Sequence, residues 1–249
     1  MTKLKLKEAL QENKLLTSFS IFFVFTFVFL GIWQIERAAH KESLLQAFNS
    51  EQESPPARLT NNSPNWSRVF VDGTFDSSKQ ILIDNQIYNG KVGYKIFTPF
   101  RFDDSKIVLV DRGWVPQGQS RSDLPLLEIV TKKSRIIGTI TSPEQGVLAG
   151  SEILTNEWPL VSQTKSVEVI ASAFKEPILD IVLVLDPGSS QIAEFIQIKP
   201  FAITPVKHYG YAMQWFTMSI VLLGMFLYAL KREKKMKEKL ILALLLITP

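Results

Sequence analysis

Two long apolar runs without a charged side chain constrain this chain more than any other feature. They cover residues 15–35 and 211–230. A helix of about 20 residues crosses the roughly 30 Å hydrocarbon core of a bilayer. Trp33 lies at the end of the first run and Trp215 near the start of the second, and amphipathic rings favour membrane interfaces. The sequence therefore predicts two transmembrane helices.

The first run is predicted to be an uncleaved membrane anchor. A cleaved signal peptide has a shorter apolar core, and a cleavage site of small residues follows it. Here the core is long, and it ends in Gly31-Ile32-Trp33-Gln34. A mitochondrial transit peptide would be rich in Arg and Ser and poor in acidic residues. The short segment before the first run contains Lys and Glu, which favours a bacterial inner membrane.

The distribution of charge predicts the topology. Four Lys residues precede the first run, and Lys231-Arg232-Glu233-Lys234-Lys235 follows the second. Lys and Arg near membrane helices favour the cytoplasmic side, so both termini are predicted to be cytoplasmic in a multi-pass protein. Residues 40–207 then lie on the opposite side. Residues 19–230 carry 18 basic and 20 acidic side chains, which argues against nucleic-acid binding.

The segment between the two runs reads as a mostly antiparallel β (α+β) extracytoplasmic domain. Its apolar, β-branched runs are separated by turn signals such as Asn89-Gly90. The expected strands cover residues 68–75, 80–83, 94–100, 106–111, 135–141, 160–162 and 181–185. One helix is expected over residues 166–174, with Ser166 as its cap. Residues 50–65, rich in Ser, Pro, Asn and Glu, are predicted to be a linker or loop.

The resulting organisation has six parts. In order, they are a cytoplasmic N-terminus (1–14), transmembrane helix 1 (15–35), a helix extension and linker (36–66), the extracytoplasmic β-rich domain (67–207), transmembrane helix 2 (208–230) and a basic cytoplasmic tail (231–249). The apolar stretch over residues 240–248 is too short to cross a bilayer. It lies either in the membrane interface or in an unstructured tail, and the sequence favours neither.

The composition excludes several kinds of chemistry. There is no Cys, so disulfides and thiolate sites are ruled out, and two His residues make a multi-histidine metal site improbable. No nucleotide-binding glycine motif, P-loop or GxSxG elbow is present, and Gly146–Gly150 has no phosphate-binding Lys. Asp84 and Asp103-Asp104 are predicted to be solvated turn residues rather than paired catalytic carboxylates. The composition does not exclude a membrane-embedded hydrolase, but no nucleophile–base pair can be named.

The chemically interesting residues gather where each apolar run meets the outer interface. Trp33, Arg37 and Lys41 share one helical stripe. A second stripe, at the start of the second run, contains His208, Tyr211 and Trp215, with Gln214 beside it. An amphipathic ligand suits such a boundary. The competing interpretation is that these residues are ordinary interfacial anchors.

His208 is the residue of that group with the most specific chemistry. A neutral imidazole is a good axial ligand for haem iron. A lone interfacial His is more often a hydrogen-bonding residue, so both interpretations stand at this point. His40 lies in the aqueous stretch without a supporting aromatic pattern, and it is the weaker candidate.

Three motifs resemble the Surfeit locus protein 1 family. The first is Leu30-Gly31-x-Trp33-Gln34-x-x-Arg37-x-x-x-Lys41. The second joins Gly90-x-x-Gly93-Tyr94-x-x-x-Thr98-Pro99 to Val108-x-Val110-Asp111-Arg112-Gly113-Trp114-Val115-Pro116. The third is His208-x-x-Tyr211-Ala212-x-Gln214-Trp215-Phe216. The chain departs from the family pattern at Gln86, where an Arg is frequent, and at Val206-Lys207, where paired Asn is frequent.

The resemblance implies an assembly factor for haem–copper cytochrome c oxidase, not an enzyme. It would assist the insertion or retention of haem a. The partners it implies are oxidase subunit I, the machinery that supplies haem a, and the lipid bilayer. His208 would be the iron ligand. The residues flanking the porphyrin or the partner helices would be Trp33, Arg37, Tyr211, Gln214 and Trp215.

Two roles within this resemblance can be argued physically. Arg37 is placed to pair with a haem propionate through a charge-assisted hydrogen bond. Arg112, Gly113 and Trp114 are expected to set a strand end and turn in the outer domain. The alternatives to haem handling are a scaffold that binds oxidase subunits without cofactor, and a membrane-anchored receptor domain for another periplasmic ligand.

Overall fold

The computed structural model describes residues 14–103, 106–120, 123–125, 131–142, 155, 157–174 and 176–247. The predictions for residues 1–13, for the Asp104 turn and for Gly146–Gly150 lie outside the described residues. The chain divides into two compact units. A helical unit combines Met1–Leu45 with Pro200–Pro249, and a β domain comprises Gln46–Lys199.

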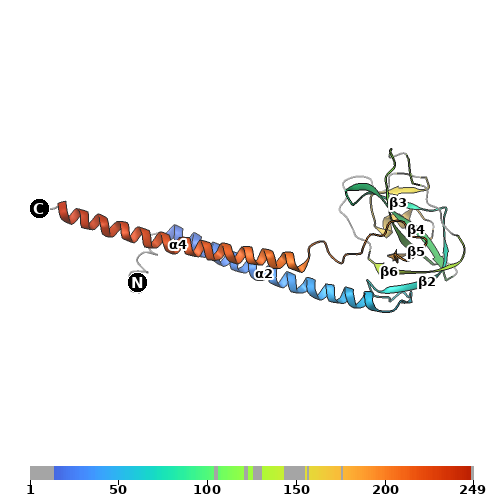
Figure 1. The fold of residues 1–249 in the computed structure, drawn as a ribbon, viewed down its shortest axis with the longest axis horizontal. Helices are drawn as coiled ribbons and strands as arrows, with labels where there is room; N and C mark the ends of the chain where they lie inside the picture. Colours follow the sequence, from blue (N-terminus) through green and yellow to red (C-terminus); the bar gives the residue numbers. More distant parts are fainter. Residues whose placement is uncertain are drawn as a thin grey trace. The chain divides into compact units, whose positions relative to one another are not determined.

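The helical unit contains two long helices, α2 (Lys14–Glu53) and α4 (Pro205–Ile247), which run side by side in Figure 1. Both are long and apolar enough to cross a membrane. Their surface is apolar in the way lipid requires, because large side chains such as Phe25 and Ile220 are 70% and 71% exposed. The two predicted spans are thus present as helices, compatible with a membrane protein.

Both helices extend beyond the apolar runs. Helix α2 continues to Glu53, so the expected linker over residues 50–65 is wrong for its first four residues. The end of the helix is held within the β domain, since Gln52 Nε2 donates to the Trp66 carbonyl at 2.8 Å and the Phe48 ring lies 5.8 Å from the Trp66 ring. Helix α4 continues through the basic run as far as Ile247, which excludes an unstructured backbone there.

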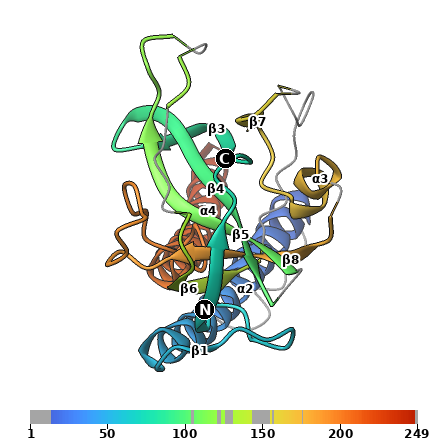
Figure 2. The same ribbon diagram turned by 90° about the vertical axis from the view of Figure 1, so that its right-hand side faces the viewer.

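Eight strands are present in the described part of the β domain. They are β1 (Ala57–Arg58), β2 (Arg68–Phe75), β3 (Ile81–Tyr88), β4 (Lys91–Phe102), β5 (Lys106–Pro116), β6 (Ser134–Thr141), β7 (Leu160–Ser162) and β8 (Ile178–Leu185). Their order is β1-β2-β6-β8-β5-β4-β3-β7, and β2 also pairs with β4. That extra pairing closes β2, β6, β8, β5 and β4 into a ring (Figure 2).

The strand pairings fit the expected architecture. Antiparallel pairs join β2 to β4 and β6, β4 to β3 and β5, and β6 to β8. Three pairs are parallel, namely β1–β2, β3–β7 and β5–β8. The domain is therefore mostly antiparallel among the described strands. Closure of the ring removes most free strand edges, which limits edge-to-edge association.

Alternation of side chains along the strands builds one core inside the ring. A cluster of buried residues draws on all five strands of the ring, and Val108 and Val110 are its members from β5. Leu109, between them, points outward into a second cluster with Ile170 of helix α3 (Val167–Ser172). Ser166 caps α3 by accepting from the Val169 amide, as the sequence predicted. The helix packs beside β8 (Figure 2).

Strands β3 and β4 are longer than expected because a tight hairpin joins them. Asn89 and Gly90 both have positive φ, 48° and 74°, which is typical of a two-residue hairpin turn. Pairing therefore continues to Tyr88 and Lys91, next to the turn. The predicted turn at Asn89-Gly90 is confirmed.

The expectation for Asp84 is wrong. Asp84 lies in β3, not in a solvated turn, and is 3% exposed. A shift of register between Ile83 and Gln86 turns the strand at this point, and Asn85 has a φ of 59°. Asp103 does lie in an exposed turn, where it pairs with Arg58 at 3.1 Å.

An ion-pair network joins β4 to the loop before β8. It predicts how the free energy of unfolding depends on pH. The hydrogen bond from Arg101, together with its charge, lowers the pKa of Glu176 to about 2. Because the folded-state pKa lies below the ordinary 4.5, the pair stabilises the fold above that pH and loses this effect as the pH falls towards 2. The free energy of unfolding should fall more steeply over this range in the natural chain than in Arg101→Met.

Chemical unfolding at several pH values measures this difference. Arg58→Met, which breaks the exposed pair with Asp103, is the matched control and should lose little stability at any pH. Equal slopes for the natural chain and Arg101→Met would contradict the prediction.

Candidate functional site

The candidate site lies in the helical unit, where the first turn of α4 faces α2. Pro205 begins α4, and His208 follows in the first turn. His208 Nδ1 lies 2.7 Å from Gln34 Oε1 of α2, and the residue is only 8% exposed. The hydrogen bond joins positions 174 residues apart in the chain. The structure therefore places the predicted iron ligand between the two helices.

The other predicted site residues divide into two groups. Trp215 is half-buried and packs on Phe27 of α2, with ring centroids 5.7 Å apart. The other four, by contrast, are exposed on the helix surfaces, and they are Trp33, Arg37, Tyr211 and Gln214. The Tyr211 ring makes an edge contact with the His208 ring at 6.5 Å. Only His208 and Trp215 of the predicted set are thus part of the interface between the helices.

Residues that share a predicted stripe differ in their burial in the structure. Lys41, half-buried, places its ammonium 5.1 Å from the Phe201 ring, whereas Trp33 and Arg37 on the same predicted stripe are exposed. His40, the weaker candidate for an iron ligand, is exposed. Gln34 belongs to the cluster predicted at the end of the first apolar run, but it was not among the candidate haem contacts, and it is the residue of α2 that contacts His208. The sequence indicates its position, because Gln34 lies three residues after Gly31 and four before Ala38 and so shares one face of α2 with them. Gly31 and Ala38 are both buried.

Small residues let the helices approach each other near this site. A Cβ at Gly31 would lie 2.7 Å from the Phe216 ring, and Ser219 Oγ donates to the Val24 carbonyl at 3.4 Å. Along α4 the inward residues His208, Ala212 and Ser219 follow one another at spacings of four and seven residues, which keeps them on one face of the helix. Small residues and interhelical hydrogen bonds are the usual means of helix packing in lipid.

Gly31→Leu is expected to separate the helices at this level, because the Phe216 ring occupies the space that the new side chain needs. Inserting a large side chain into a packed interface costs about 1–3 kcal/mol. Since the chain has no Cys, a cysteine pair at positions 24 and 219 reports helix contact without background. Its crosslinking rate should fall in Gly31→Leu and change little in Gly210→Leu, where a Cβ meets nothing within 4 Å. An unchanged rate in Gly31→Leu would refute the packing argument.

The motif Arg112-Gly113-Trp114 has a structural role that differs from the expected one. The three residues lie inside β5, which continues to Pro116, so they do not form a strand end. Gly113 has a φ of 94°, and a Cβ there would lie 2.5 Å from the Glu194 carbonyl oxygen. The glycine is required by a kink within the strand, where the segment around Glu194 pairs with it.

Trp114 packs on the other part of its own family-like motif, the segment that begins with Gly90-x-x-Gly93. A Cβ at Gly93 would lie 2.6 Å from the indole of Trp114, so only glycine leaves room for this ring. The indole Nε1 donates to the Gln86 carbonyl at 2.9 Å, and the Tyr88 ring lies 5.6 Å away. The two parts of the motif therefore meet in one packing unit on β3, β4 and β5.

The charged residues next to Trp114 stabilise the same kink in β5 through hydrogen bonds. Asp111 Oδ1 accepts from the Gly113 amide at 2.9 Å, and its Oδ2 accepts from Lys95 Nζ at 2.6 Å. Arg112 turns into the ring, where its Nε donates to the Gln191 carbonyl and its guanidinium lies 5.6 Å from the Phe75 ring. Burial lowers the pKa of Arg112. These contacts are structural, and they bring no reactive pair together.

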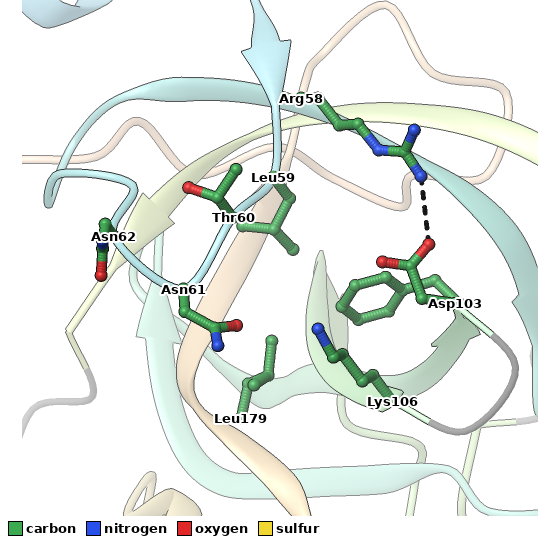
Figure 3. Close-up of a pocket in the computed structure, with 9 residues that line it drawn as sticks. Arg58, Leu59, Thr60, Asn61, Asn62, Asp103, Lys106 and Leu179 are labelled. Atoms are coloured by element: carbon green, nitrogen blue, oxygen red, sulfur yellow. Dashed lines mark hydrogen bonds and ion pairs between the residues drawn. The ribbon is translucent and has the colours of Figure 1, made fainter.

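A pocket of about 350 Å³ lies elsewhere in the β domain, as Figure 3 shows. Its floor includes Leu59 and Leu179, and its rim carries Arg58, Asp103 and Lys106. The Arg58–Asp103 pair spans the rim with side chains 69% and 44% exposed. None of the predicted site residues lies here. Within the described ranges, no three Asp, Glu or His side chains gather in a way that would hold a metal ion.

Comparison with known proteins gives a consistent result. The model of the SURF1 family matches residues 21–220. A SURF1-like protein of Rickettsia felis is 26% identical over 215 residues, which cover 83% of this chain and 93% of the relative. A SURF1-like protein of Rickettsia conorii is 26% identical over 229 residues, covering 88% and 92%.

A shorter match carries a functional name. The cytochrome oxidase assembly protein SHY1 of Saccharomyces cerevisiae is 29% identical over 103 residues. The match covers 38% of this chain and 26% of that protein. The likeness to SHY1 is therefore local, whereas the family match extends from the first apolar run into the second.

Proposed function

This chain belongs to the SURF1 family, and from that membership we propose that it assists the assembly of cytochrome c oxidase in a membrane. A relative named as a cytochrome oxidase assembly protein supports the role, and two helices long enough to span a bilayer support the location. The proposed role is not enzymatic. The membrane we propose is a bacterial inner membrane, with both termini in the cytoplasm and the β domain on the other side.

The proposed task within assembly is to hold haem a, as cargo, before or during its insertion into oxidase subunit I. The observation that carries this proposal is the contact between His208 Nδ1 and Gln34 Oε1. A hydrogen bond to one ring nitrogen leaves the other as the coordinating atom, which is the usual arrangement of metal-binding histidines. His208 and Gln34 therefore fit an arrangement in which His208 would bind the iron through its other ring nitrogen.

The exposed residues around His208 suit the rest of a porphyrin. Trp33 and Tyr211 are 43% and 41% exposed, and they offer flat apolar surfaces next to the His208 level. Arg37 lies one turn after Trp33 on α2 and is exposed to pair with a propionate. The machinery that supplies haem a and subunit I would approach this surface.

A second candidate function is a scaffold that binds oxidase subunits and no cofactor. The burial of His208 favours it, since a residue 8% exposed and hydrogen-bonded across a helix interface is also what simple helix packing produces. Under this alternative the exposed residues Trp33, Arg37, Tyr211 and Gln214 would contact protein or lipid alone.

Purification of the full chain from cells that make haem a separates the two functions. The proposed function predicts a Soret band in the absorption spectrum and co-purification of oxidase subunits. A colourless protein that still brings down oxidase subunits would reject haem handling and leave the scaffold. A protein that brings down neither would overturn both functions, including the role in assembly.

A further inference from the structure

We infer that Gln34 is a positioning residue that fixes His208 in the tautomer with the proton on Nδ1, so that Nε2 presents its lone pair to a haem iron. The tautomer follows from the contact alone. Its consequence for iron rests on the proposed function. Gln34 is not among the residues predicted to touch the haem, and it acts here only through His208.

The orientation of the Gln34 amide, with Oε1 toward the ring, decides which nitrogen carries the proton. An amide oxygen accepts hydrogen bonds and cannot donate them. With Gln34 Oε1 2.7 Å from Nδ1, the ring must donate from Nδ1. A neutral imidazole carries one N–H, so Nε2 is left as the acceptor nitrogen, the form in which it binds a metal.

The surroundings keep this hydrogen bond in place. His208 is 8% exposed and Gln34 is half-buried, so few water molecules compete for either group. A hydrogen bond is stronger in such a medium than in water, and leaving either group unpaired is costly. The edge contact from Tyr211 also limits rotation of the ring. The ring plane and the tautomer are therefore set before any ligand arrives.

A neutral hydrogen-bond acceptor at position 34 suits a site from which haem must later be released. A carboxylate in this place would draw the Nδ1 proton more strongly and make Nε2 a stronger electron donor to iron. Hydrogen bonding of this kind is one of the means by which a protein changes the reduction potential of haem. Glutamine orients the imidazole without that extra donation, and it places no unpaired charge between the helices.

The tautomer can be measured without haem. The chain has two His residues, so His40→Gln leaves His208 as the single one. In this background, ¹⁵N NMR of labelled histidine in detergent at mildly alkaline pH should show Nδ1 protonated and Nε2 unprotonated. Adding Gln34→Glu should keep that pattern, because a carboxylate also accepts. Adding Gln34→Leu should lose it.

Gln46→Leu is the matched control, because Gln46 is an exposed glutamine on the same helix. It should leave the His208 pattern unchanged. A protonated Nε2 in the His40→Gln background would overturn the inference, as would an unchanged pattern in Gln34→Leu. These results do not depend on haem, so they cannot be confused with a failure of the proposed function.

Haem binding then tests the consequence. Gln34→Leu should weaken the binding of added haem by about 10–100-fold, and Gln34→Glu should restore binding while lowering the midpoint potential. A helix-packing role alone would not make the Leu variant lose the Nδ1-protonated pattern and the Glu variant keep it. If the natural chain binds haem and Gln34→Leu binds it equally well, Gln34 does not position the ligand. If the natural chain binds none, only the proposed function fails.

Discussion

Replacing Trp114 with alanine is expected to lower the free energy of unfolding of the β domain by about 3–5 kcal/mol. Trp114 is 3% exposed, and its removal leaves a cavity against Gly93. The change also removes the donor to the Gln86 carbonyl. Because natural domains are stable by only about 5–15 kcal/mol, the substitution removes a large part of the total.

Urea unfolding of the full chain in detergent measures this effect, with hydrogen exchange on strands β3, β4 and β5 reporting the β domain separately from the helices. Trp158→Ala is the matched control, since Trp158 is 37% exposed and contacts the Phe174 ring at its edge. Its loss should be clearly smaller. Equal losses for the two variants would show that the packing of Trp114 on Gly93 is not what holds this part of the domain.

The fold was predictable where local pattern decides it. The alternation in residues 68–75 gave strand β2 with its observed bounds, and Ser166 marked the start of α3. Asn89-Gly90 gave the hairpin turn because both positions need positive φ. In each case the physical cause lies within a few residues of the signal.

The sequence failed where distant strands decide the local structure. Arg112-Gly113-Trp114 looks like a turn, yet the backbone stays in β5, because the segment around Glu194 pairs with it 80 residues later. Asp84 looks solvated, yet it lies in a strand that β4 and β7 cover on both edges. Side-chain character alone cannot indicate which later segment covers a strand.

In the candidate site, too, some features were predictable from the sequence and others depend on distant contacts. The topology inferred from the charge distribution predicted that the end of the first apolar run and the start of the second lie at the same membrane interface. It did not show that Gln34 is the residue facing His208, because that depends on how α2 is rotated about its axis. The rotation is set by Gly31, where the Phe216 ring can approach only because a Cβ is missing.

His208→Ala is expected to remove bound haem from the purified protein, with a loss of the Soret band of at least about tenfold. In the proposed site His208 is the one iron ligand among the described residues, so an axial bond has no replacement. The remaining aromatic contacts, at Trp33 and Tyr211, would hold a porphyrin only by stacking, which gives affinity without ligation. The amount of haem that co-purifies should therefore fall together with the Soret band.

The matched control is His40→Ala, the other histidine of the chain, which is exposed on α2. It should keep both the spectrum and the oxidase subunits that co-purify. Helix contact in His208→Ala is checked by crosslinking between positions 24 and 219, because removal of the His208–Gln34 hydrogen bond can loosen the pair. A normal Soret band in His208→Ala with intact crosslinking would place the ligand elsewhere. Addition of imidazole distinguishes the remaining outcomes, since recovery of the band shows that only the ligand was missing from an otherwise formed site.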